Sequence, residues 1–246
     1  MAIKRKHNDG MDHKMLYSVL DEDARFDFVE SYKMLRTNLE FVAAADKCKM
    51  VEIVSSVPDE GKSNVIVNLA YTIAKSGKKV CVVDCDLRKP CMYRYFKVSH
   101  KCKGLTNVLA GQVDLDSTLI TDNGVSVLLS GDCPPNPSEI LSSNGMKNII
   151  RELNEKFDFV LFDTPPITIV TDAIVLGKLI DGAIIVVRYN YSDMKIVRDA
   201  KKYLEAGNIK IFGTVISNYT KKYSSYKKNY YYSYYTSQTN DNDGES

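Results

Sequence analysis

One segment limits what this chain can fold into more than any other: Ser56-Val-Pro-Asp-Glu-Gly-Lys-Ser63, which matches the phosphate-binding loop (P-loop) pattern with a serine in place of the first glycine. A short apolar run, 50–55, precedes it, and a helical pattern follows over 61–75. A strand, a tight loop and a helix N-terminus together bind anions because backbone amides and the helix dipole face the phosphates. We therefore expect the chain to bind ATP.

Each residue type in this loop has a physical role in phosphate binding. Gly61 lets backbone amides approach phosphate oxygens, Lys62 reaches the β- and γ-phosphates, and the Ser63 hydroxyl is a ligand for Mg²⁺. A chance Gly-Lys-Ser in an ordinary strand–turn–helix is the alternative, but the apolar strand before it and the helix after it favour phosphate binding. The residues that we expect to bind the nucleotide here are Ser56, Pro58, Asp59, Glu60, Gly61, Lys62, Ser63 and Asn64.

Apolar runs alternate with helical patterns over residues 25–217, which we expect to form one domain. Besides 50–55, the expected strands are 79–84, 126–129, 159–162, 182–187 and 210–216; besides 61–75, the expected helices are 28–44, 138–156, 171–179 and 193–206. This alternation predicts an α/β fold of the P-loop NTPase type, with a mostly parallel central sheet and helices on both faces. Ser138, which follows a proline, is the expected N-cap of the 138–156 helix.

Three aspartates follow expected strands, and ligands of parallel sheets bind at such strand ends. Asp163 ends the run FDFVLFD, as a Walker B aspartate does, and is expected to hold Mg²⁺ directly or through water. Asp84 and Asp86 follow the run KVCVV. Aspartate is common at strand ends because it caps turns, but three of them together with a P-loop favour a functional role.

Composition narrows the classes of function. The net charge of +2 shows no excess of basic residues of the kind that binds nucleic acid, so we expect no nucleic-acid partner. No apolar run approaches the roughly 20 residues that a membrane-spanning helix needs. The six cysteines form no CxxC pair and the three histidines lack metal-type spacing, so reduced thiols are expected and a zinc site is not.

The two ends of the chain differ in composition from the middle. Residues 1–24 are polar and charged, which is typical of a flexible arm. After Ser217 the aliphatic residues disappear, and half of the 16 tyrosines lie among Lys, Ser, Thr and Asn. We expect residues 218–246 to form a disordered, tyrosine-rich tail.

Four segments together resemble the bacterial tyrosine kinases (BY-kinases) of capsule and exopolysaccharide synthesis: ESYKMLRTNLEF, SSVPDEGKSNVIVNLA, VCVVDCDLRKP and FDFVLFDTPPI. The segment PPNPSEIL at 134–141 and the tyrosine-rich end are also similar to that family. The resemblance covers the chain from about residue 28 to its end, and VDxDLRKP with a tyrosine-rich tail is its most specific part. Asn64 departs from the family, in which Thr is usual after the P-loop serine.

The resemblance implies a cytoplasmic kinase that uses ATP and Mg²⁺ to phosphorylate its own tail and regulates polysaccharide synthesis and export. It implies Asp84, Asp86 and Lys62 at the catalytic centre, and which aspartate accepts the acceptor's proton stays open. Ser63, Asp86 and Asp163 are the expected metal ligands. The expected phosphate acceptors are Tyr223, Tyr226, Tyr230, Tyr231, Tyr232, Tyr234 and Tyr235.

The resemblance also implies partners. A membrane-embedded polysaccharide co-polymerase adaptor would activate the kinase and recruit it to the inner face of the membrane, and a cognate tyrosine phosphatase would reverse the reaction. Glu30, Lys33 and Arg36 match a motif for ring-like homo-oligomers, but Lys33 replaces an arginine and loses bidentate pairing. Asn218 follows the last strand, where related nucleotide-binding proteins place a residue that contacts the base.

Two other functions are compatible with a P-loop on this fold. A partitioning or positioning ATPase would share the fold, but it usually has a second lysine early in the loop, where this chain has Ser56 and Val57. A non-catalytic, nucleotide-gated regulator of polysaccharide chain length would not need Lys62 together with three aspartates at strand ends. The sequence therefore favours the kinase.

Overall fold

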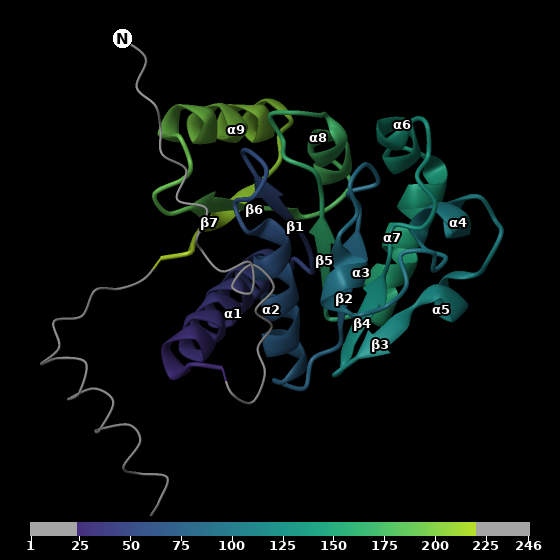
Figure 1. Cartoon of the computed structure of the whole chain (residues 1–246), viewed down its shortest axis with the longest axis horizontal. Helices are drawn as coiled ribbons and strands as arrows, with labels where there is room; N and C mark the ends of the chain where they lie inside the picture. The colour runs from purple at the N-terminus through teal and green to yellow at the C-terminus, as the bar shows by residue number, and fades with distance from the viewer. Residues whose placement is uncertain (1–23, 220–246) are drawn as a thin grey trace, which may run out of the picture.

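The computed structural model describes residues 24–219 (Figure 1). The expected arm, 1–24, and the expected tail, 218–246, lie almost wholly outside that range. The strands are β1 (Met50–Ser55), β2 (Val80–Asp84), β3 (Ile120–Asp122), β4 (Val125–Leu128), β5 (Phe159–Asp163), β6 (Gly182–Arg188) and β7 (Ile211–Ser217). The helices are α1 (Phe26–Asp46), α2 (Lys62–Ala74), α3 (Met92–Tyr95), α4 (Leu105–Leu109), α5 (Leu115–Thr118), α6 (Pro137–Leu141), α7 (Asn144–Lys156), α8 (Asp172–Gly177) and α9 (Met194–Ala206).

The strands form one sheet in the order β3-β4-β2-β5-β1-β6-β7. Every neighbouring pair is parallel except β3 and β4, which are antiparallel. From β1 the chain crosses over to β2 on one side, whereas from β5 it crosses over to β6 on the other side. This reversal at the adjacent strands β1 and β5 is a topological switch point, where α/β sheets form a crevice at the carboxyl ends of their strands.

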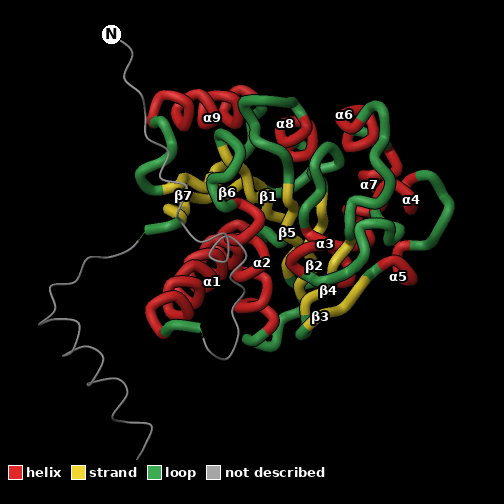
Figure 2. The backbone as a smooth tube through the Cα atoms, viewed as in Figure 1, coloured by secondary structure: helices red, strands yellow, loops and turns green. Residues whose placement is uncertain are grey.

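Helices cover both faces of the sheet, and Figure 2 shows the strands running between them. On one face α1, α2 and α3 share a core with alternate strand residues such as Val51 and Ile53. On the other face α7, α8 and α9 pack against the intervening residues, such as Met50 and Val54. Because both faces are covered, β1 is buried along its whole length, as expected of a central parallel strand. The predicted α/β fold with a mostly parallel sheet is confirmed.

The helix predicted over 138–156 is wrong as a single element, because the structure divides it into α6 and α7. Ser143 has an extended backbone (ψ 159°) and accepts a hydrogen bond from the Met146 amide, which makes it the N-cap of α7. Ser138 is not an N-cap: it lies inside α6, which begins at Pro137 after Asn136. The repeated serines interrupt the helix because their side chains offer the backbone a competing hydrogen bond.

The sequence did not predict β3 or the helices α3, α4 and α5. β3 has three residues and each helix has four or five, which is too short for a periodic pattern to emerge. Within residues 24–219 no helix combines the length and apolar character that crossing a bilayer requires. No disulfide joins any of the six cysteines, all of which lie in this range.

Candidate functional site

The P-loop joins β1 to α2 and requires a left-handed backbone at two positions. Asp59 has φ +62° and Gly61 has φ +87°. A Cβ atom added to Gly61 would lie 3.3 Å from the Ser217 hydroxyl at the end of β7. Glycine is therefore needed at 61 both for its backbone conformation and for the close approach of β7.

Lys62 and Ser63, the first two residues of α2, both bind Asp163 at the end of β5. Lys62 Nζ donates to one carboxylate oxygen, and Ser63 Oγ donates to the other at 2.9 Å. Asp163 is fully buried and Lys62 is 8% exposed. Burial disfavours the charge on Lys62, but the Asp163 carboxylate and other acidic groups outweigh it, so the pKa of Lys62 is raised. The structure thus brings together the three residues expected at the phosphates and the metal.

Asp84 is the partner of Asp163 across the adjacent strands β2 and β5. Its buried carboxylate accepts hydrogen bonds from the amides of Asp86 and Met92, both at 3.2 Å. Burial, reinforced by the charge on Asp163, raises the pKa of Asp84 well above its usual range. Asp84 therefore fixes the loop that follows β2, which carries Asp86.

Asp86 differs from Asp84 in its surroundings. Asp86 is 9% exposed, whereas Asp84 is fully buried. One carboxylate oxygen of Asp86 accepts the Lys89 amide at 2.9 Å, which caps the turn after β2. Of the two aspartates, Asp86 is thus the more accessible residue.

These residues fit Mg-ATP, although in residues 24–219 no group of three or more His, Cys, Asp or Glu side chains is arranged to hold a metal ion. Mg²⁺ prefers oxygen ligands and is commonly held by one or two carboxylates together with phosphate oxygens of the substrate. The Ser63 hydroxyl and the Asp163 carboxylate already lie 2.9 Å apart at the start of α2. A cation bound here would take its remaining ligands from the nucleotide and water.

Two predicted nucleotide-binding residues use their side chains elsewhere. The Glu60 carboxylate is buried inside the loop and accepts hydrogen bonds from the amides of Ser56 at 2.6 Å and Val57 at 3.1 Å. The Asn64 carboxamide accepts a hydrogen bond from the Tyr32 hydroxyl of α1 at 3.3 Å. A nucleotide contact by either residue would therefore involve its backbone, and it stays a prediction.

The structure also shows functional candidates that sequence reasoning missed. Arg88, two residues after Asp86, forms two hydrogen bonds with the buried Asp172 of α8, at 2.8 and 3.0 Å. Ser138 of α6 donates to the same carboxylate. Cys91 Sγ lies 3.2 Å from Ser63 Oγ. Arg88 stands in the VDCDLRKP motif, but nothing in the sequence marks Asp172 as its partner.

The predicted oligomerisation residues lie on α1. Lys33 Nζ pairs with Glu30 at 2.7 Å on the surface, whereas Arg36 donates to the Thr72 carbonyl of α2 at 3.1 Å. Arg36 therefore joins α1 to α2 within the subunit. The role of the motif in assembly stays a prediction. Asn218, also left-handed (φ +54°), follows the end of β7 next to the P-loop. The predicted acceptors Tyr223, Tyr226, Tyr230, Tyr231, Tyr232, Tyr234 and Tyr235 lie outside the described residues.

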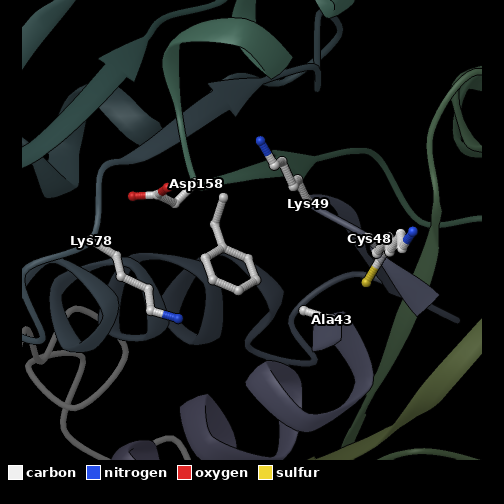
Figure 3. Close-up of a pocket in the computed structure, with 7 residues that line it drawn as sticks. Ala43, Cys48, Lys49, Lys78 and Asp158 are labelled. Carbon is white, nitrogen blue, oxygen red and sulfur yellow. The ribbon is translucent and has the colours of Figure 1, made fainter. Parts of the chain in front are cut away.

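A pocket of about 320 Å³ lies at the amino ends of β1 and β5, whereas the P-loop follows the carboxyl end of β1 (Figure 3). Three lysines contribute to its wall, and Lys78 Nζ lies 5.3 Å from the centre of the Phe159 ring. β1 separates this pocket from the P-loop by its length of six residues, about 20 Å. It is therefore not the nucleotide site. The pocket is lined by Ala43, Lys47, Cys48, Lys49, Lys78, Asp158 and Phe159.

Comparison with known proteins places this site in a family. A family model described as an AAA domain matches residues 49–205. Tyrosine-protein kinase YwqD of Bacillus subtilis is 38% identical over 213 residues, which cover 86% of this chain and 87% of YwqD. The chain belongs to the bacterial tyrosine kinase family. Tyrosine-protein kinase etk of Escherichia coli K12 is 35% identical over 80% of this chain, although the match covers only 27% of etk.

Solved structures agree with this membership. The kinase domain of the Escherichia coli tyrosine kinase ETK has a TM-score of 0.73 and 34% identity, covering 80% of this chain and 79% of that one. The Pyrococcus furiosus cell division ATPase MinD is less similar, with a TM-score of 0.57 and 26% identity over 68% of this chain and 71% of that one. The predicted family and enzyme class, a protein-tyrosine kinase on a nucleotide-binding P-loop fold, are thus confirmed.

Proposed function

We propose that this BY-kinase transfers the γ-phosphoryl group of ATP to tyrosines of its own C-terminal tail. The observation that supports this proposal is that Lys62 and Ser63 both donate hydrogen bonds to the Asp163 carboxylate, while Asp84 ends the adjacent strand. A lysine, a hydroxyl group and two carboxyl groups therefore lie close together at the carboxyl ends of the strands. Phosphoryl transfer needs these groups because catalysis rests on positioning and on neutralising phosphate charge.

In this proposal Lys62 binds the β- and γ-phosphates, and its raised pKa keeps it charged at neutral pH. Mg²⁺, when bound, neutralises phosphate charge, and the chain offers it the oxygens of Ser63, Asp86 and Asp163. The acceptor oxygen forms a bond to the γ-phosphorus as the bond from that phosphorus to the ADP oxygen breaks. Charge stabilisation and alignment, which Lys62 and the loop supply, carry most of the rate.

The phenol proton of the acceptor is the remaining problem. A phenol has a pKa near 10 and an ordinary aspartate a pKa near 4, so transfer before attack would cost about 8 kcal/mol. A loose transition state allows the proton to leave late. We assign the hydrogen bond to the acceptor hydroxyl to Asp86, because Asp84 is fully buried and bound to the amides of Asp86 and Met92.

The wider role is proposed on the resemblance to the family. The kinase would regulate capsule or exopolysaccharide synthesis and export at the inner face of the membrane, where a co-polymerase adaptor recruits and activates it. Ring-like homo-oligomers would let one subunit phosphorylate the tail of another, and a cognate phosphatase would reset the tail. We further propose that residues 25–217 act as the kinase domain and 218–246 as the acceptor tail.

The fate of the γ-phosphate separates this function from its alternatives. The full chain is incubated with Mg²⁺ and γ-labelled ATP, and protein-bound label and free phosphate are both measured. Label on tyrosine is expected for the wild type and for the exposed control Lys147→Met, and its loss is expected for Lys62→Met. Free phosphate alone would indicate a partitioning-type ATPase, and neither product would indicate a nucleotide-gated regulator.

A further inference from the structure

The segment between β6 and α9, residues 188–192, lies against the outside of the P-loop; we call it the brace. Its side chains bind three consecutive P-loop residues. Arg188 Nη1 donates to the Asp59 carbonyl at 2.9 Å, and the Tyr191 hydroxyl donates to the Pro58 carbonyl at 3.3 Å. The Ser192 hydroxyl donates to the Glu60 carboxylate. The brace and the P-loop are about 130 residues apart in sequence, so this contact is a product of the fold.

Glu60 connects the brace to the first half of the P-loop. Its side chain is 1% exposed, and its carboxylate accepts hydrogen bonds from the amides of Ser56 and Val57 and from the Ser56 hydroxyl. A buried carboxylate is stable only when such donors replace water. A P-loop binds phosphate through the direction of its backbone amides. Because Glu60 stands near the end of the loop and its carboxylate binds the amides at the loop's start, it fixes the curvature on which the remaining amides depend.

The brace is itself held firmly. The Ser192 hydroxyl accepts the Arg188 amide at 2.8 Å, so one hydroxyl closes the brace and also donates to Glu60. The Arg188 guanidinium lies 4.9 Å from the centre of the Tyr191 ring. The Tyr189 amide donates to the Ser217 carbonyl at 3.0 Å, which ties the brace to the end of β7. Ser217 in turn donates its hydroxyl to the Glu60 carbonyl.

We propose that Glu60 and the brace hold the P-loop in its phosphate-binding shape. Arg188, Ser192 and Glu60 are then positioning residues: they set nucleotide affinity through the loop and make their contacts to protein atoms. This inference rests on the proposed function only in that the P-loop binds ATP. It revises the sequence-based prediction for Glu60, whose carboxylate orders the loop from within.

The experiment measures Mg-ATP binding to the full chain by calorimetry, a readout that does not depend on phosphoryl transfer. Ser192→Ala and Glu60→Gln are each expected to raise the Kd about tenfold, the effect of losing one hydrogen bond to a charged group. Ser192→Thr, which keeps the hydroxyl, is expected to stay within about twofold of the wild type. Arg198→Ala, an exposed arginine on the neighbouring helix α9, is the matched control and should bind as the wild type does.

A second readout separates positioning from simple loss of folding. Amide hydrogen exchange over residues 56–61 should speed up in Ser192→Ala, while exchange in the distant strand β4 stays unchanged. In the double variant the two effects on Kd should be less than additive because the two residues share one hydrogen bond. If both single variants bind within twofold of the wild type, the proposal is wrong. If only Arg188→Ala weakens binding, Arg188 touches the nucleotide itself and the brace is also overturned.

Failure of the proposed function would look different. A wild-type chain that binds Mg-ATP but places no label on tyrosine would contradict the kinase proposal. The brace proposal could then still be tested through the Kd for Mg-ATP. If the wild type binds Mg-ATP and the Ser192→Ala and Glu60→Gln variants have the same Kd as the wild type, the brace proposal alone is contradicted.

Discussion

Lys62 donates a hydrogen bond to Asp163, a residue 101 positions later in the chain, and both side chains are buried. The pair joins the start of α2 to the end of β5 at the switch point of the sheet. Ser63 adds a second hydrogen bond to the same carboxylate. Asp163 therefore aligns the two residues that are predicted to bind the phosphates and the metal.

Removing the Asp163 charge should damage both stability and catalysis. Asp163→Asn leaves the buried Lys62 ammonium without its counter-charge, and breaking such a pair costs roughly 3–5 kcal/mol of the free energy of unfolding. The kcat for tyrosine phosphorylation should fall at least about a hundredfold. Urea denaturation and a labelled-phosphate assay measure the two effects. Asp158→Asn, an exposed aspartate at the opposite edge of the sheet, is the control.

Gly61→Ala should weaken nucleotide binding through the backbone of the P-loop. The left-handed conformation costs about 1–3 kcal/mol for a residue with a side chain, and the added Cβ would lie 3.3 Å from the Ser217 hydroxyl. Gly77→Ala is a matched control, because Gly77 is also left-handed (φ +83°) but has no atom within 4 Å of the added Cβ. Both variants should lose stability, and calorimetry should show weaker Mg-ATP binding only for Gly61→Ala. Equal Kd values for the two variants would contradict this account.

We expect Glu52 to make the stability of the protein depend on pH. It lies in the middle of β1, fully buried, and among the described residues neither of its carboxylate oxygens finds a hydrogen-bond partner. Burial raises the pKa of Glu52 to about 8, and the positive charge on Lys62 opposes the shift only in part. The unfolded chain releases this proton near pH 4.5 and the folded chain near pH 8. Stability is therefore full below the lower value and is lost as the pH rises toward the upper one.

The difference between wild type and Glu52→Gln isolates this effect. Between pH 5.5 and 7.5 the wild type should lose about 2–3 kcal/mol of the free energy of unfolding relative to the variant, at 1.36 kcal/mol per pH unit. Urea titrations at several pH values measure it, with the exposed Glu155→Gln as the control. Parallel pH profiles for wild type and Glu52→Gln would show that Glu52 is ionised in the folded protein.

Arg88→Lys should lower kcat and leave the Kd for Mg-ATP close to the wild-type value. Arg88 holds Asp172 with two hydrogen bonds, and a lysine cannot reproduce that bidentate geometry. The loop that carries Asp86 would lose this anchor to α8, whereas the P-loop contacts of the nucleotide would remain. A loss of kcat of about tenfold is expected for a misplaced catalytic group. Arg151→Lys, on the surface of α7, is the control, and a rise in Kd without a change in kcat would contradict the assignment.

Much of this molecule follows from its sequence because the signals are local. The apolar run Met50–Ser55 has the bounds predicted for it, and Asp84 and Asp163 end adjacent strands, as parallel strand ends in a P-loop fold predict. The break at Ser143 was missed because serine is compatible with both a helix interior and an N-cap, and only tertiary packing decides between them.

Contacts between segments that are distant in the chain could not be predicted from the sequence. Arg88 and Asp172 are 84 residues apart, and Ser192 and Glu60 are 132 residues apart. No period or motif encodes such a pair in one sequence, because many charged and hydroxyl residues are equally available as partners. Glu60 was predicted to bind the nucleotide because it stands in the P-loop, yet the fold turns its carboxylate toward the amides of the loop itself.

We propose that Lys62 and its partners transfer phosphate from ATP to the tail, and phosphotyrosine mapping shows whether they do. The full-length wild type, Lys62→Met and the control Lys147→Met are each incubated with Mg-ATP and analysed by mass spectrometry of the tail peptides. We predict phosphate on tyrosines between residues 223 and 235 in the wild type and the control, and none in Lys62→Met. Equal tail phosphate in wild type and Lys62→Met, or none in any of the three, would contradict the account.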